Sequence, residues 1–107
     1  MKYSRWHSTI CNALSDTGWV AGVGSKRGVS MLEASEHADL IVIWGGNPVN
    51  TQVNVMTHAS RARKERGAKI AAIDVYNNDT MKQADIKILL RPGTDGAFAA
   101  RLRRHTA

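Results

Sequence analysis

The stretch Asp39–Thr51, D-L-I-V-I-W-G-G-N-P-V-N-T, decides the fold of this 107-residue chain. An apolar run of strand-forming residues, Leu40–Trp44, ends abruptly in the turn G-G-N-P at positions 45–48, and a segment with helical periodicity follows. In an open α/β sheet, ligands bind at the carboxyl ends of the strands, just before the next helix begins. Glycines let backbone N–H groups approach a ligand closely, and a helix N-terminus favours anions. The stretch therefore predicts a strand followed by a phosphate-binding turn.

Helix-like and strand-like segments alternate along the rest of the chain. The run Leu40–Trp44 is almost continuously apolar, which predicts a strand buried on both faces. Ahead of it, Ser30 and Glu33 form a capping-box pattern, which predicts a helix that ends at His37. The further elements we expect are the helix Asn50–Arg66 closed by Gly67, the strand Lys69–Asp74, the helix Thr80–Ala84, the strand Ile86–Leu90, and a helix from Asp95 capped by Thr94.

The order of these elements predicts the fold class. Strands that alternate with helices form parallel βαβ units with right-handed crossovers. We therefore expect an α/β fold with a small parallel sheet of about three strands. Residues 1–29 have no clean periodicity, and Gly18, Gly22 and Gly24 indicate loose turns, so this part is expected to be an irregular lead-in. No repeat or linker divides the chain, which predicts one domain over residues 1–107 with an atypical basic tail at 101–107.

Bulk composition excludes several classes of protein. The apolar share, 43%, is that of a globular chain. The single cysteine, Cys11, excludes an internal disulfide framework and a cysteine-rich zinc or iron–sulfur site made by this chain alone. No apolar run approaches the roughly 20 residues of a membrane helix, and the first residues lack the apolar core of a signal peptide. The sequence therefore predicts a cytoplasmic location without a membrane segment.

The formal net charge of +6 suggests a polyanionic partner, but the positions of the charges favour another interpretation. Basic residues gather on the predicted helix Asn50–Arg66 and in the last seven residues. Removing Arg101, Arg103 and Arg104 from the 15 basic residues leaves 12 against 9 acidic ones, a net charge of +3. No aromatic residues alternate with the basic ones, as stacking platforms for single-stranded nucleic acid require. We therefore interpret the charge as a solvated helix face and an unusual tail, with a nucleic-acid surface as the alternative.

Polar, turn-rich groups follow all three predicted strands, and a parallel sheet places them at one edge. Gly45, Gly46 and Asn47 would offer backbone donors to a phosphate. Asp74 would accept hydrogen bonds from a ribose diol, and Asp95 from the N1–H and amino group of a guanine. Taken singly, each group has a structural alternative: an ordinary turn, a cap at Asp74, and an ordinary helix start at Asp95. Their joint occurrence predicts a nucleotide site.

Other chemistries lack support in the sequence. The dinucleotide fingerprint G-x-G-x-x-G is absent, which counts against a plain NAD-dependent dehydrogenase. The four histidines are scattered without ligand spacing, so no metal site and no catalytic group are expected in this chain. We interpret Trp19 and Trp44 as packing residues in preference to substrate platforms.

Four segments together resemble the molybdopterin oxidoreductases of the dimethyl-sulfoxide-reductase type, whose relatives include formate dehydrogenases and nitrate reductases. These segments are T-I-C-N-A-L-S-D-T-G-W at 9–19, W-G-G-N-P-V-N-T-Q at 44–52, I-D-V-Y-x-x-x-T-x-x-Q-A-D at 73–85 and R-P-G-T-D-G-A at 91–97. They are long, ordered and correctly spaced. The resemblance extends from about His7 to Ala100, most of the chain.

The resemblance implies a cofactor of molybdenum or tungsten bound by two molybdopterin guanine dinucleotides. It also implies a Rossmann-like, three-layer domain, of which this chain is a fragment that holds the guanosine diphosphate arm of one dinucleotide. Cys11 matches a family position near the pterin, with a small buried apolar thiol as the alternative. The implied cofactor-binding residues are Trp44, Gly45, Gly46, Asn47, Pro48, Val49, Asn50 and Thr51 around the diphosphate, Asp74, Val75 and Tyr76 at the ribose and guanine, and Gly93, Thr94 and Asp95 over the base.

Departures from the family pattern shape the remaining expectations. Many relatives have proline where this chain has Val75, and they continue with an apolar helix where residues 101–107 are basic. The family's iron–sulfur cysteines and its metal-ligating residue would lie upstream of Met1. We therefore expect the remainder of a catalytic subunit as partner and no turnover by this chain alone. Self-association is expected through apolar surface near the helix Asn50–Arg66, Trp6 and Trp19. The alternative function is a stand-alone guanine-nucleotide-binding module without redox activity.

Overall fold

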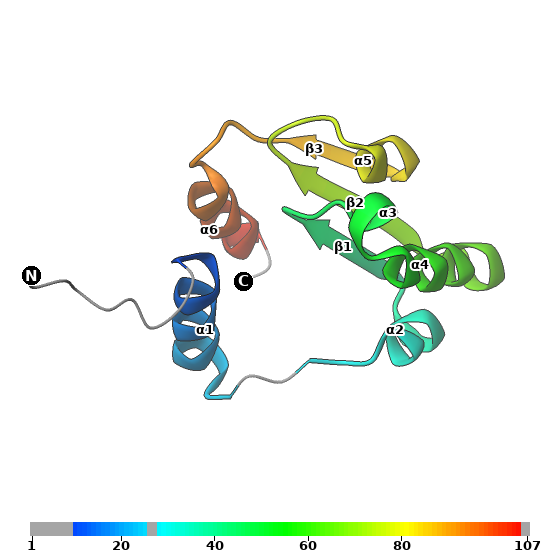
Figure 1. The fold of residues 1–107 in the computed structure, drawn as a ribbon, viewed down its shortest axis with the longest axis horizontal. Coiled ribbons are helices and arrows are strands. Elements are labelled where there is room, and N and C mark those ends of the chain that lie inside the picture. Colours follow the sequence, from blue (N-terminus) through cyan, green and yellow to red (C-terminus); the bar gives the residue numbers. More distant parts are fainter. Residues whose placement is uncertain (1–9, 26–27, 106–107) are drawn as a thin grey trace, which may run out of the picture.

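The computed structural model describes residues 10–25 and 28–105. Helices and strands alternate along this part of the chain, with the three strands side by side and their arrowheads at one edge (Figure 1). Trp6 and His7 lie outside the described residues. The elements are α1 (Ile10–Val23), α2 (Met31–His37), β1 (Leu40–Trp44), α3 (Pro48–Thr51), α4 (Val53–Arg66), β2 (Lys69–Asp74), α5 (Asp79–Gln83), β3 (Ile86–Leu89) and α6 (Asp95–His105).

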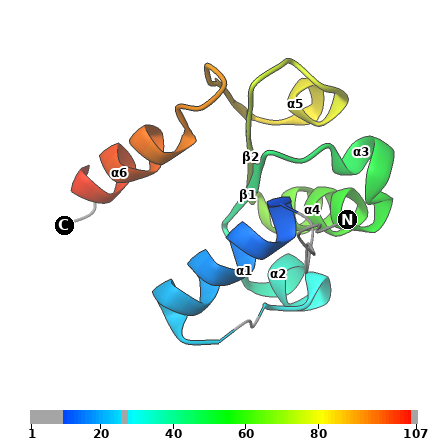
Figure 2. The same cartoon turned by 60° about the vertical axis from the view of Figure 1, so that its left-hand side comes forward.

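The three strands form a parallel sheet in the order β1-β2-β3, which confirms the predicted fold class. In the register of the sheet, Ile43 is opposite Ala72, and Ala72 is opposite Lys87. Figure 2 shows α4 and α5 on one side of the strands and α6 on the other. The central strand of the sheet is β2.

The hydrophobic core lies between the sheet and α4. Ile70 and Ala72 of β2 are buried, as are Met56 and Ala59 of α4. Small side chains at Ala59 and Ala72 let the helix approach the strand closely, and long ones fill the space at the margins. The complete buried cluster is Ile43, Met56, Ala59, Ile70, Ala72, Met81 and Ala84, with Ile41 and Val49 packed against it.

The opposite face of the sheet is apolar but open. Leu40 and Val42 are each 50% exposed, Trp44 is 38% exposed and Ile86 is 44% exposed. The prediction that β1 is buried on both faces is therefore wrong. The physical reason is that, within residues 10–25 and 28–105, no helix packs across this face, whereas α4 covers the other one.

Two helix ends follow the sequence signals closely. The Ser30 hydroxyl accepts a hydrogen bond from the Glu33 backbone N–H at 3.1 Å and begins α2, as predicted. Gly67 ends α4 in the left-handed region, with φ of 74°, and its N–H donates to the Arg63 carbonyl at 3.0 Å. The same end of α4 is tied to β1, because Arg66 donates to Asp39 at 2.9 Å and to the Ala38 carbonyl at 3.1 Å.

The expected irregular lead-in is wrong, because residues 10–23 form the helix α1. Gly18 and Gly22 lower helix propensity, but neither breaks the helix. The Thr17 hydroxyl donates a hydrogen bond to the Ala13 carbonyl at 2.9 Å. Gly24 ends the helix with a φ of 78°. Leu14, Trp19, Val20 and Val23 of α1 are all exposed.

Other boundaries also differ from the prediction. The helix predicted from residue 50 begins earlier, as α3, and is interrupted at Gln52, whose φ of −142° and ψ of 61° are not helical. The helix α5 begins and ends one residue earlier than predicted, and β3 ends at Leu89. The helix α6 extends from Asp95 through the predicted basic tail as far as His105. Among the described residues, no helix has both the length and the apolar character needed to cross a bilayer.

We predict that the Asp85 carboxylate makes folding sensitive to acid. Asp85 accepts a hydrogen bond from the Ile70 N–H at 2.9 Å and lies 3.7 Å from Arg63, and these partners lower its pKa below the ordinary 3.8. The charged form is favoured in the fold, so its stabilisation is present above about pH 4 and is lost as the pH falls through the lowered pKa. Asp85→Asn should flatten the decline in melting temperature between pH 5 and pH 2.5. A decline as steep as that of the Glu36→Gln control would contradict the prediction.

We also predict that the open sheet face causes self-association. Exposed apolar patches of this kind mark association surfaces. Sedimentation velocity should show concentration-dependent association of the unchanged chain. The double variant Val42→Thr with Ile86→Thr keeps β-branched strand residues and should weaken the association. Val29→Thr, an exposed position ahead of α2, is the matched control. A monomer at every concentration tested would refute the prediction.

Candidate functional site

The three loops predicted to form a site do lie at one edge of the sheet. The parallel register places Trp44 beside Ile73 and Asp74 beside Leu89, so the loops after β1, β2 and β3 leave the sheet together (Figure 1). Positive φ values at Gly45 (65°) and Gly93 (81°) turn the first and third of these loops away from their strands. The prediction that the three loops lie at one edge of the sheet is therefore confirmed.

Only part of the first loop has free backbone donors. The Gly45 N–H donates to the Ile73 carbonyl at 2.9 Å and continues the sheet, so the prediction that Gly45 donates to a phosphate is wrong. The Val49 N–H donates to the Thr80 hydroxyl at 3.2 Å. Among the described residues, the N–H groups of Gly46 and Asn47 have no acceptor. These two groups are the remaining backbone donors at the end of β1.

The residues that follow this turn support its shape. Pro48 is buried in the first turn of α3, where a missing N–H costs nothing. The N–H groups of Asn50 and Thr51 both donate to the Asn47 carbonyl, at 3.0 and 3.1 Å, and the Thr51 hydroxyl does so at 3.0 Å. These three bonds to the Asn47 carbonyl fix the position of Asn47 at the start of α3.

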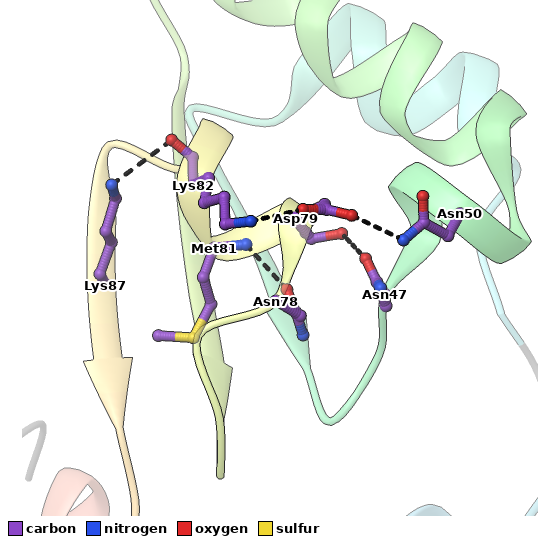
Figure 3. A network of polar contacts seen from close by, with 8 residues as sticks. Asn47, Asn50, Asn78, Asp79, Met81, Lys82 and Lys87 are labelled. Atoms are coloured by element: carbon purple, nitrogen blue, oxygen red, sulfur yellow. Dashed lines mark hydrogen bonds and ion pairs between the residues drawn. The ribbon is translucent and has the colours of Figure 1, made fainter.

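The helix α5 joins the first two loops through three polar side chains that sequence reasoning did not assign to the site (Figure 3). Asn78 begins α5, accepting from the Met81 N–H at 2.9 Å, and donates to Asp74 at 2.7 Å. Asp79 accepts from Asn50 at 2.8 Å, and the buried Thr80 hydroxyl donates to the Asn47 side chain at 2.9 Å. The only sequence signal was the run N-D-T at 78–80, which is typical of a helix start.

Asp79 carries a second charge contact. Its carboxylate also accepts from Lys82 at 2.8 Å, and the hydrogen bonds from Lys82 and Asn50 lower its pKa below the usual value. Asp79 therefore stays ionised at neutral pH and keeps its bond to Asn50. This contact fastens the start of α5 to α3.

Asp74 is fixed at the end of β2 by two donors. Its Oδ1 atom accepts from the Val75 N–H at 2.6 Å and its Oδ2 atom from the Asn78 amide at 2.7 Å. Proline at position 75 would lack the N–H that makes the first bond. Asn78, and not Asp74, caps the next helix. Both Val75 and Tyr76 are exposed beside the carboxylate.

The third loop is joined to the first through Trp44. The Trp44 indole N–H donates to Asp95 Oδ1 at 2.7 Å, and its ring meets Phe98 edge-on with centroids 5.7 Å apart. These contacts support the interpretation of Trp44 as a packing residue, whereas Trp19 is about half exposed on α1. Thr94 precedes α6 as predicted, and its carbonyl accepts from the Phe98 N–H at 3.0 Å. The Thr94 hydroxyl donates to the Arg91 carbonyl at 2.7 Å.

Cys11 lies in the first turn of α1 and is exposed, so the alternative of a buried thiol is wrong. In the described part of the chain, α1 is not packed against the sheet, and Cys11 is not brought to the three loops. The described residues also contain no group of histidine, cysteine and carboxylate side chains that could hold a metal ion.

A separate cavity of about 120 Å³ lies between α2, β1 and α4. Met31, Ile41 and Val55 are among its mostly apolar lining residues. His58 also lines it, and the His58 Nδ1 atom is buried without a hydrogen-bond partner. The cavity is on the core side of the sheet and includes none of the predicted cofactor-binding residues.

Comparisons with known proteins agree with the resemblance seen in the sequence. A family model described as molybdopterin oxidoreductase matches residues 3–106. The probable oxidoreductase YoaE of Bacillus subtilis (strain 168) is 39% identical over 99 residues, and the assimilatory nitrate reductase catalytic subunit of the same organism is 32% identical over 99 residues. Each match covers 92% of this chain and 14% of the relative.

An archaeal relative matches a slightly shorter segment. F420-dependent formate dehydrogenase 1 subunit alpha of Methanococcus maripaludis is 36% identical over 89 residues, covering 79% of this chain and 13% of that protein. The chain therefore spans a short internal segment of the relatives that it matches.

We predict that the Trp44 indole N–H holds α6 against the end of β1. Trp44→Phe keeps an aromatic ring near Phe98 but removes the bond to Asp95. Hydrogen exchange of the α6 amides should become faster, by the equivalent of about 1 kcal/mol, the net contribution of one hydrogen bond. Exchange in β2 should not change. Trp19→Phe on α1 is the control, and unchanged exchange in α6 of the Trp44 variant would contradict the prediction.

Proposed function

This chain belongs to the molybdopterin oxidoreductase family, and from that premise we propose that it binds the guanosine diphosphate arm of a molybdopterin guanine dinucleotide. The observation that carries the proposal is the meeting of three polar loops at the carboxyl edge of a parallel sheet, where α/β folds bind nucleotides. Residues 1–107 are proposed to act as one fragment of a Rossmann-like binding domain.

The donors at the end of β1 fit a diphosphate. The N–H groups of Gly46 and Asn47 have no acceptor among the described residues, and the glycine at position 46 leaves room for an oxygen to approach. Trp44, Gly45 and residues 48–51 shape this turn by bonding to one another and to α5. In this proposal they surround the diphosphate without all donating to it.

The carboxylates of the other two loops fit a ribose and a guanine. Each oxygen of Asp74 already has one donor, but a carboxylate oxygen accepts two hydrogen bonds, so ribose hydroxyls can still bind. Asp95 uses its Oδ1 atom for Trp44, and the carboxylate can accept the adjacent N1–H and amino group of guanine. The proposal assigns Val75 and Tyr76 to the flank of the ribose and base, and Gly93 and Thr94 to the loop over the base.

The whole enzyme is proposed to be an oxidoreductase of which this chain forms part. The relatives named above include a nitrate reductase and a formate dehydrogenase, and this chain spans about a seventh of their length. A molybdenum or tungsten centre carried by two such dinucleotides would supply two-electron redox chemistry. The contribution of this chain's own residues is to bind and orient the nucleotide arm, and the remainder of the catalytic subunit is the proposed partner. Cys11 is proposed to lie near the pterin in the assembled subunit.

A stand-alone module that binds guanine nucleotides is the second candidate, because the free donors and both carboxylates belong to this chain. Native mass spectrometry of the purified protein separates the two candidates. A co-purified pterin dinucleotide supports the cofactor proposal, whereas a simple guanine nucleotide supports the module. Co-purified nucleic acid would favour the third interpretation, a basic surface.

We predict that Asp95 selects guanine. Calorimetry should detect binding of GDP and much weaker binding of ADP, because adenine has an acceptor where guanine has N1–H. Asp95→Ala should weaken GDP binding by about 1.5–3 kcal/mol, the range for a hydrogen bond to a charged group. Asp95→Asn keeps an oxygen that accepts from the Trp44 indole but loses one of the two acceptors for guanine. Weaker GDP binding by this variant therefore reports loss of the base contact and not loosening of α6. Equal affinity for GDP and ADP would refute the assignment.

A further inference from the structure

Thr80 lies where α5 meets the turn after β1, and its side chain is completely buried. Its Oγ1 atom accepts a hydrogen bond from the Val49 N–H at 3.2 Å and donates one to the Asn47 Oδ1 atom at 2.9 Å. The contacts span 31 and 33 positions of sequence. One hydroxyl of α5 therefore fixes both the Val49 backbone and the Asn47 side chain of the first loop.

Burial decides the direction of the bond between Thr80 and Asn47. A hydroxyl has one hydrogen to donate, and a buried hydroxyl that leaves it unpaired is destabilised. The Val49 N–H already occupies a lone pair of Oγ1, and among the described residues Asn47 Oδ1 is the acceptor that the hydroxyl has. The hydrogen is therefore directed at Asn47, which must present its oxygen, and not its amino group, to Thr80.

This orientation turns the other half of the Asn47 amide away from α5. Among the described residues, the Asn47 Nδ2 group has no acceptor. It is also not fully buried, so it remains in contact with solvent. Figure 3 shows Asn47 and Asn50 on the turn after β1 and on α3, opposite the α5 residues to which they bond. The backbone N–H of Asn47 and that of Gly46 are free in the same turn.

We propose that Thr80 is a positioning residue that holds the Asn47 amide with its Nδ2 group toward the diphosphate, which adds a side-chain donor to the two backbone donors. The inference rests on the proposed binding of a guanosine diphosphate arm. Thr80 itself does not touch the ligand. It acts by fixing which end of the Asn47 amide faces outward.

Two neighbouring contacts keep Thr80 in place for this task. Asp79 is bonded to Asn50 at 2.8 Å, and Asn78 is bonded to Asp74 at 2.7 Å. The two residues that precede Thr80 are therefore tied to α3 and to the end of β2. These bonds oppose movement of the Thr80 backbone away from Asn47.

The test compares Thr80→Val, which removes the hydroxyl at nearly constant shape, with Thr80→Ser, which keeps it. Calorimetry with GDP should show about a tenfold lower affinity for Thr80→Val, the loss of one well-placed hydrogen bond to a charged group, and near-normal affinity for Thr80→Ser. Guanosine, which has no phosphate, should bind both variants as it binds the unchanged chain. Thr57→Val is the matched control, because the exposed Thr57 hydroxyl bonds only within α4.

A second variant leaves the Thr80 bond in place. Asn47→Asp keeps an acceptor for the hydroxyl but replaces the Nδ2 donor with an oxygen, so GDP binding should fall further than in Thr80→Val while guanosine binding is retained. Asn47→Asp has no side-chain amide at position 47. The signal that is missing from its ¹H–¹⁵N spectrum is therefore the Asn47 side-chain amide signal of the unchanged chain. That signal should shift when GDP is added to the unchanged chain, and should already be displaced in Thr80→Val without ligand.

The outcomes separate this inference from the proposed function. No binding of GDP by the unchanged chain would overturn the proposed function and this inference with it. Normal GDP binding by a folded Thr80→Val variant would overturn the inference alone. If Thr80→Val does not fold, Asn47→Asp decides the question, and GDP affinity equal to that of the unchanged chain would overturn the assignment of Asn47.

Discussion

Burial of the central strand β2 is the constraint on which the rest of the structure depends. Ile70 and Ala72 face α4, and Ala71 and Ile73, which point to the other face, are also buried. Hydrogen bonds run from β2 to β1 on one side and to β3 on the other, so neither outer strand has a partner without it. The small residues at its centre allow α4 to approach, and this contact forms the core.

The edge of the sheet proposed to bind the nucleotide is organised by polar bonds between segments distant in sequence. Asn78, Asp79 and Thr80 each bond to a residue of a neighbouring loop or of α3. Trp44 makes the corresponding bond between β1 and α6. Because these groups bond to one another, the loops have a defined shape before any ligand arrives, which reduces the entropy lost on binding. The binding edge thus depends on side chains that need not touch the ligand.

Much of the fold was predictable because strong local signals agreed with it. Continuous apolar runs bounded by glycine, proline and aspartate located the three strands, and Gly67 located the end of α4. The open face of β1 was not predictable, since an apolar run does not reveal whether a neighbour covers it. The helix α1 was missed because Gly18 and Gly22 oppose helix formation only weakly when the surrounding residues favour it.

The candidate site was predictable to the level of its loops, but not to the level of individual bonds. The strand ends located Asp74 and Asp95, because the ends of parallel strands lie at one edge. That Gly45 donates within the sheet depends on its register with Ile73, which the sequence alone does not specify. The role of Thr80 depends on contacts across more than 30 positions, whereas its local context indicates only a helix start.

The central position of β2 also sets the order in which the molecule can assemble. Pairing of β1 with β2 first requires closure of the segment that contains α3 and α4, and formation of α4 shortens that segment. The third strand also pairs with β2, so both outer strands depend on it. The bond of Thr80 to Asn47 then links α5 to the turn after β1, and the bond of Trp44 to Asp95 links the end of β1 to the start of α6. We therefore expect the binding edge to be the last part of the domain to become native during folding, and the transition state to contain β1, α4 and β2 without it.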